Sequence, residues 1–70
     1  MVRTTVSSSN LHSVGYDPVT MILEIEFNSG GIYQYSGVPA NIHQGLMSAS
    51  SHGTFFHQYI KDVYPFRRIC

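Results

Sequence analysis

The stretch that decides the fold is TMILEIEF at residues 20–27, which is followed by NSGG at residues 28–31. Every odd-numbered position of the first segment is apolar, whereas its even-numbered positions include Glu24 and Glu26. This period of two is typical of a half-buried β-strand. The glycine pair of NSGG favours a hairpin turn, because glycine tolerates positive φ angles. Residues 32–36 are therefore predicted to form the returning strand, and the two carboxylates to lie on a solvated or interfacial sheet face.

The segments on either side of this hairpin complete the predicted fold. Residues 11–16 favour a preceding strand, which Asp17-Pro18 ends with a turn. Pro39 suits the first turn of a helix, and Ile42, Leu46 and Ala49 follow it at helical spacing. A second helix is expected over residues 54–63, with Phe56, Ile60 and Val63 on one stripe and Pro65 beyond its end. The order β-β-β-α-α predicts an α+β fold in which a three-stranded antiparallel meander carries two helices on one face.

Length and composition limit the class of protein. The chain has 70 residues, 11% of them charged, and four Lys and Arg balance four Asp and Glu. It lacks the charge excess of a disordered tail, the long apolar run of a membrane helix and the pattern of a secretory signal. We expect one cytoplasmic domain with its core at about residues 7–64 and a tail at residues 65–70. Because so short a chain buries little core, we also expect a homo-oligomer.

Nothing in the sequence indicates catalysis or a metal. Cys70 is the only cysteine and has no chain beyond it to hold a base. The four histidines are separated by 31, 9 and 5 positions, which are not zinc-ligand spacings on one helix. Glycine-rich phosphate-binding motifs are lacking as well. We therefore expect a protein that is not an enzyme and carries no cofactor.

Two tyrosines form the first candidate binding element. Tyr33 and Tyr35 share one face of the returning strand, where aromatic rings either fill the core or stack on a ligand base. The register of the hairpin decides which face they occupy. If Phe27 pairs with Ile32 they lie on one face, and if Phe27 pairs with Tyr33 they lie on the other.

Two short segments are candidates for binding phosphate. Ser51, His52 and Gly53 precede the second predicted helix, whose first N–H groups attract anions; the alternative is a plain helix cap and turn. Arg67 and Arg68 form the only basic pair, and arginine binds phosphate with two parallel hydrogen bonds. The alternative for this pair is a solvated tail.

Residues along most of the chain resemble the KTSC domain family, which is named after a C-terminal segment of some lysyl-tRNA synthetases and also occurs as small separate bacterial proteins. The resemblance spans about residues 7–64. It is carried by Ser8, Ser9, Leu11, Val14, Gly15, Tyr16 and Asp17; by Leu23, Ile25, Phe27 and Gly30; by Tyr33, Tyr35, Val38 and Pro39; and by Ala49, Ser51, Gly53, Phe55 and Phe56 with Ile60, Lys61 and Tyr64. The family's Tyr-x-Tyr element falls on Tyr33 and Tyr35, and its Ser-x-Gly element on Ser51 and Gly53. His57 stands where the resemblance implies Asn in many members.

Resemblance and charge suggest different ligands. The association with a synthetase implies nucleic-acid binding, but affinity for a long polyanion needs many Lys and Arg residues. Four basic residues suffice only for a small ligand. We therefore expect a non-enzymatic module for a small phosphorylated ligand of nucleotide type, such as a cyclic or signalling nucleotide, acting as a sponge or sensor. An RNA- or tRNA-binding accessory domain and a protein–protein interaction module are the alternatives.

Overall fold

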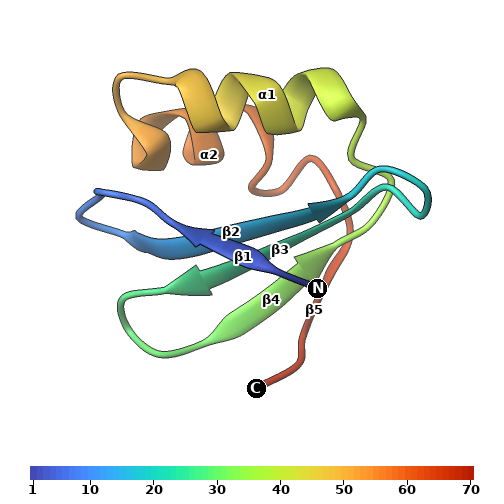
Figure 1. The fold of residues 1–70 in the computed structure, drawn as a ribbon, viewed down its shortest axis with the longest axis horizontal. Helices are drawn as coiled ribbons and strands as arrows, with labels where there is room; N and C mark the ends of the chain where they lie inside the picture. Colours follow the sequence, from blue (N-terminus) through green and yellow to red (C-terminus); the bar gives the residue numbers. More distant parts are fainter.

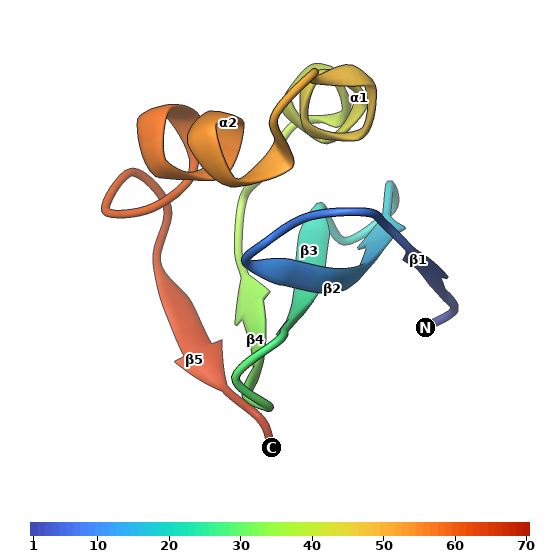
Figure 2. The same ribbon diagram turned by 90° about the vertical axis from the view of Figure 1, so that its left-hand side faces the viewer.

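The computed structural model describes residues 1–70 as two layers, a five-stranded antiparallel sheet and a pair of helices that cover one of its faces (Figure 1). The strands follow one another in chain order across the sheet. Figure 2 shows α1 above the side of the sheet that holds β1 and β2, and α2 above the side that holds β4 and β5. The elements are β1 (Arg3–Thr5), β2 (Leu11–Asp17), β3 (Ile22–Phe27), β4 (Ile32–Tyr35), α1 (Ala40–Ser48), α2 (His52–Tyr59) and β5 (Phe66–Arg68).

The predicted α+β arrangement with both helices on one face is confirmed, but the number of strands was wrong. The sheet has five strands rather than three, because β1 and β5 add one short strand at each edge. Each of the two is only three residues long, which is too short for a period-two pattern to show in the sequence. The expected tail thus contains β5, which pairs with β4 from Phe66 to Arg68.

The hairpin formed by β3 and β4 places both tyrosines on the face that the helices cover. Glu26 pairs with Ile32, so Ile25 lies opposite Tyr33 and Leu23 lies opposite Tyr35. Phe27 therefore pairs neither with Ile32 nor with Tyr33, the two pairings that were predicted as alternatives. The tyrosines nevertheless lie on the face that a pairing of Phe27 with Tyr33 would have given them. Leu23 and Ile25 are completely buried on this face and form the centre of the core.

The helices follow the predicted stripes with shifted ends. Leu46 in α1 and Phe56 in α2 are buried against the sheet, as is Ile60 directly after α2. The second helix begins two residues earlier than predicted and ends at Tyr59 rather than Val63. A helix that continues through Val63 is excluded by Asp62, whose φ of 62° lies in the left-handed region. Neither helix is long and apolar enough to cross a membrane.

The opposite face of the sheet is less solvated than predicted, because Glu24 is buried. Glu24 is 5% exposed and accepts hydrogen bonds from Arg3 Nη1 at 2.5 Å and from Gln34 Nε2 at 2.9 Å. Arg3 also donates to Ser13 Oγ at 2.9 Å, and Ser13 donates to Glu26 at 3.0 Å. The two glutamates therefore belong to a hydrogen-bonded network rather than to an open surface.

Gly15 in β2 lets the N-terminal residues approach this face closely. A Cβ atom at Gly15 would lie 2.8 Å from the carbonyl oxygen of Val2 and 3.0 Å from Cγ of Arg3. The absence of a side chain at this position therefore allows β1 to carry Arg3 to Glu24.

We predict that Gly15→Ala destabilises the protein by about 1–3 kcal/mol, the usual range for overpacking a tight site. The obstacle is a backbone carbonyl, which cannot turn away as a side chain can. Urea unfolding followed by circular dichroism measures the loss, with the exposed β1 position Thr4→Ala as the control. A Gly15→Ala protein as stable as the wild type would contradict this account of how β1 is docked.

Candidate functional site

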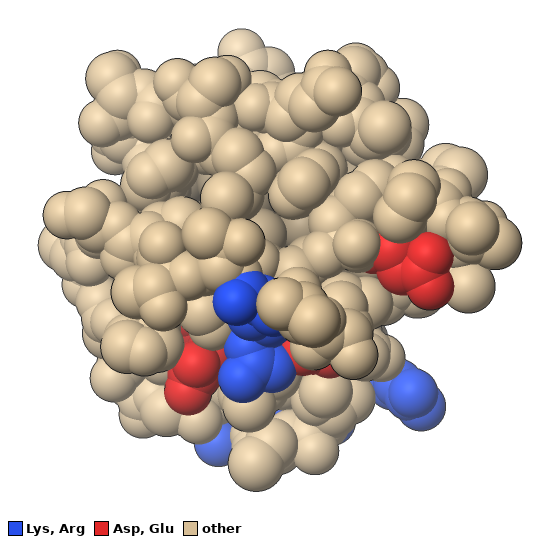
Figure 3. Space-filling view, in the orientation of Figure 1, with Lys and Arg blue, Asp and Glu red and all other residues tan.

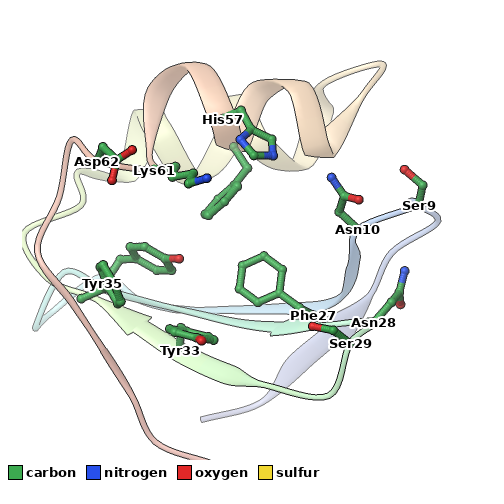
Figure 4. A pocket seen from close by; sticks show the side chains of 12 residues that line it. Ser9, Asn10, Phe27, Asn28, Ser29, Tyr33, Tyr35, His57, Lys61 and Asp62 are labelled. Atoms are coloured by element: carbon green, nitrogen blue, oxygen red, sulfur yellow. The ribbon is translucent and has the colours of Figure 1, made fainter.

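A groove of about 580 Å³ opens between α2 and the sheet, and we call it the aromatic groove (Figure 4). Its floor consists of aromatic side chains from β3, β4, β5 and α2, namely Phe27, Tyr33, Tyr35, Phe56 and Phe66. Its rim consists of polar side chains, namely Ser9, Asn10, Asn28, Ser29, His57, Lys61 and Asp62.

The five rings of the floor form a closed circuit of contacts. Phe27 contacts Tyr33 and Phe56, with ring centroids 5.5 and 5.3 Å apart. Tyr35 contacts Phe56 and Phe66, both at 5.6 Å. Phe66 closes the circuit on Tyr33 at 5.7 Å. The pairs are edge-to-face or tilted, which are favourable aromatic geometries, so the floor is held in place before a ligand arrives.

Tyr35 brings a polar atom to this apolar floor. Its side chain is almost entirely buried, yet its hydroxyl makes no hydrogen bond within the protein and points into the groove (Figure 4). Tyr16, by contrast, donates its hydroxyl to the carbonyl oxygen of Val38 at 2.6 Å. Burial, followed by the neighbouring Tyr33 and Asp62, raises the pKa of Tyr35 to about 12. Its hydroxyl therefore stays protonated, and can donate, at neutral pH.

The rim carries a cation without an ion-pair partner. Lys61 follows α2 and extends its amine over the groove from the helix side (Figure 4). The ion pairs of the chain all involve Arg3, so Lys61 is free to meet an anion. His57 lies beside it on the same side of the groove, while Asp62 at the margin offsets part of the positive charge.

The structure brings three of the predicted ligand-binding residues together. Tyr33 and Tyr35 line the groove, and the guanidinium carbon of Arg68 lies 5.9 Å from the ring centroid of Tyr33. Arg67 does not join them, because it pairs with Gln34 and its side chain falls on the opposite face of the sheet. The basic pair is thus divided between two faces, with one cation beside the groove.

The segment predicted to bind phosphate before the second helix has structural contacts instead. Ser51 Oγ caps α2 by accepting a hydrogen bond from the N–H of Thr54 at 3.2 Å. The Nδ1 atom of His52 lies 2.7 Å from a backbone carbonyl oxygen of α1. Gly53 is buried. None of the three predicted residues lines the aromatic groove, and Ser51 forms the helix cap that was the alternative for this segment.

Sequence reasoning missed several residues of the groove. Phe66 was placed in a tail, and only its pairing opposite Tyr35 brings it to the floor. Lys61 was placed within a helix, whereas it follows the true end of α2 at Tyr59. Asn10 and Asn28 come from loops, and the backbone N–H of Asn28 donates to the carbonyl oxygen of Asn10 at 2.8 Å. No local pattern predicts such long-range contacts, although Lys61, as the only lysine of the chain, was a usable signal.

Comparisons with known proteins agree on one family. The family model described as the KTSC domain matches residues 7–64. A relative from Stutzerimonas stutzeri is 48% identical over 61 residues, which are 87% of this chain and 86% of the relative. The crystal structure of a KTSC domain protein from Yersinia pestis has a TM-score of 0.96 and 49% sequence identity, covering 99% of this chain and 97% of that one. A lysine–tRNA ligase from Nostoc sp. is 39% identical over 54 residues, which are 77% of this chain but only 10% of the ligase.

Proposed function

The chain belongs to the KTSC domain family, and from this premise we propose that its aromatic groove binds a small phosphorylated ligand of nucleotide type without catalysing a reaction. One observation carries the proposal: an ordered aromatic floor lies directly below an unpaired lysine. Such a floor stacks a planar base, and a lysine amine binds phosphate as a point charge. The volume, about 580 Å³, is typical of small-molecule sites.

The distribution of charge supports a small ligand over a long polymer. Of the four basic residues, Arg3 is paired with Glu24 and Glu26, and Arg67 lies on the face away from the groove. Figure 3 shows, at the centre of the face it presents, basic side chains flanked by acidic ones in a largely uncharged surface. Only Lys61 and Arg68 remain near the groove, which suits one or two phosphates rather than an extended backbone.

We predict that Lys61→Ala weakens the binding of a nucleotide about tenfold or more, because a hydrogen bond to a charged group contributes about 1.5–3 kcal/mol. Calorimetry would measure the affinity for a panel of AMP, GMP, CMP, UMP, cyclic AMP, cyclic GMP and cyclic di-GMP. Arg67→Ala is the matched control, since it removes a cation of the opposite face and should leave the affinity unchanged. Absence of binding by the whole panel would contradict the proposed function.

A second candidate is an RNA-binding accessory domain, favoured by the relatives that are lysine–tRNA ligases. The groove would then hold one unpaired base of a single strand on its aromatic floor. With only Lys61 and Arg68 to meet phosphates, the logarithm of affinity should fall with the logarithm of salt at a slope of only about −1.4, from about −0.7 for each phosphate. A retarded tRNA band without heat from any nucleotide would favour this candidate over the first.

A further inference from the structure

We propose that the hydroxyl of Tyr35 determines the specificity of the aromatic groove, by donating a hydrogen bond to an acceptor atom on the edge of a planar heteroaromatic ring. This inference rests on the proposed function, and it narrows the ligand to one whose ring carries a keto oxygen or an unprotonated ring nitrogen. A plain hydrocarbon ring with a phosphate would fill the same space without that contact.

The Tyr35 hydroxyl has no hydrogen-bond partner in the protein, although the side chain is buried. Tyr35 is 5% exposed, and no group of the protein accepts from its hydroxyl or donates to it. Every fully enclosed polar side-chain atom of the protein has a hydrogen-bond partner. The Tyr35 oxygen therefore keeps contact with solvent, and the groove that Tyr35 lines is where that contact lies. A ligand that covers the floor removes this water and must replace its hydrogen bond.

The neighbours of Tyr35 hold its hydroxyl in a fixed position. The Tyr35 ring lies between Phe56 and Phe66, with centroids 5.6 Å from each. The backbone of Tyr35 is paired with Leu23 in the middle of the sheet on one side and with Phe66 on the other. Because neither the ring nor the strand can move freely, the hydroxyl is preorganised for one acceptor position.

The other polar side chains of the groove lie around its rim. Figure 4 shows the Tyr35 hydroxyl pointing toward the middle of the groove, while Lys61 extends from the helix side and Asn10 lies at the opposite end. A ligand with its ring on the floor and its phosphate at Lys61 thus presents its ring edge to Tyr35. A site built to hydrogen-bond a ligand discriminates strongly against an analogue that lacks the partner atom, since the protein group is then left unpaired.

The experiment compares two ligands on three proteins. The ligands are the tightest-binding nucleotide of the panel above and phenyl phosphate, which has a planar ring and a phosphate but no acceptor on its ring. The proteins are wild type, Tyr35→Phe, and Tyr59→Phe, whose hydroxyl lies outside the groove. Calorimetry gives the affinities, and thermal unfolding verifies that each variant is folded.

Tyr35→Phe is expected to weaken the nucleotide about five- to tenfold, leaving phenyl phosphate unchanged and Tyr59→Phe like the wild type. Unchanged nucleotide affinity in Tyr35→Phe would overturn the inference, and so would equal losses for both ligands, which would indicate a displaced floor. If Lys61→Ala still weakened the nucleotide in either case, the proposed function would survive. Absence of binding by every nucleotide to the wild type would overturn both.

Discussion

Phe56→Ala should destabilise the protein by about 3–5 kcal/mol, the range for truncating a buried phenylalanine. Phe56 is 5% exposed and its ring packs against Phe27 and Tyr35. It is also the side chain that α2 contributes to the floor of the groove. A domain of this length has roughly 4–10 kcal/mol of total stability, so the loss would leave much of the protein unfolded at moderate temperature.

Urea unfolding provides the measurement, with Phe66→Ala as the matched control. Phe66 lines the same groove but is 56% exposed on an edge strand, so its truncation should cost less than about 1 kcal/mol. If Phe56→Ala proves too unstable to measure, Phe56→Leu gives a smaller loss on the same scale. Equal losses at Phe56 and Phe66 would contradict the view that Phe56 joins the helix layer to the core.

The parts of the fold that were predictable are those that repeat a pattern over several residues. The alternation in β3 and the helical stripe through Leu46 were recognisable because every second residue of a strand, or every third to fourth residue of a helix, faces the same environment. β1 and β5 have no such repeat. Their pairing is decided by neighbours far along the chain, such as Gly15 opposite Arg3.

The candidate site was only partly predictable for the same reason. Tyr33 and Tyr35 were identified because they are close in sequence, but the face they occupy depends on the register of the hairpin. Lys61 and Phe66 come to the groove through the end of α2 and the pairing of β5, which are tertiary features. Ser51 was considered both as a ligand-binding residue and as a helix cap, because caps and anion sites use the same atoms, and its bond to Thr54 shows that it forms the cap.

Glu24 shows how misleading an alternating pattern is for a charged residue. Its position predicted a solvated carboxylate, whereas the N-terminal strand covers it and pairs it with Arg3. Burial alone would raise the pKa of Glu24, but the hydrogen bonds from Gln34 and Arg3, together with the charge of Arg3, hold that pKa below its ordinary value of 4.5. The ionised carboxylate is therefore the form that the folded protein favours.

From this pairing we predict that Arg3→Met destabilises the protein by about 2–3 kcal/mol at pH 7. Removing one partner of a fully buried ion pair costs about 3–5 kcal/mol. We expect a smaller loss here because the Arg3 side chain is 27% exposed. Methionine keeps most of the length and the apolar contacts of the side chain, so the loss reports the charge. Urea unfolding at pH 7 measures it, and Arg67→Met, which removes a cation without an ion pair, should change stability by less than about 0.5 kcal/mol.

The dependence on pH separates the ion pair from simple packing. Because folding lowers the pKa of Glu24, its contribution in the wild type is present above pH 4.5 and is lost as the pH falls through the folded pKa. In Arg3→Met no cation offsets the cost of burying the charged Glu24 carboxylate, so protonation of Glu24 removes that cost and stabilises the variant. The difference in unfolding free energy between the two proteins should therefore be largest at pH 7 and become smaller as the pH falls below 4.5. A difference that stays constant from pH 7 to pH 3 would contradict the prediction, because the loss would then not come from the ionised carboxylate of Glu24.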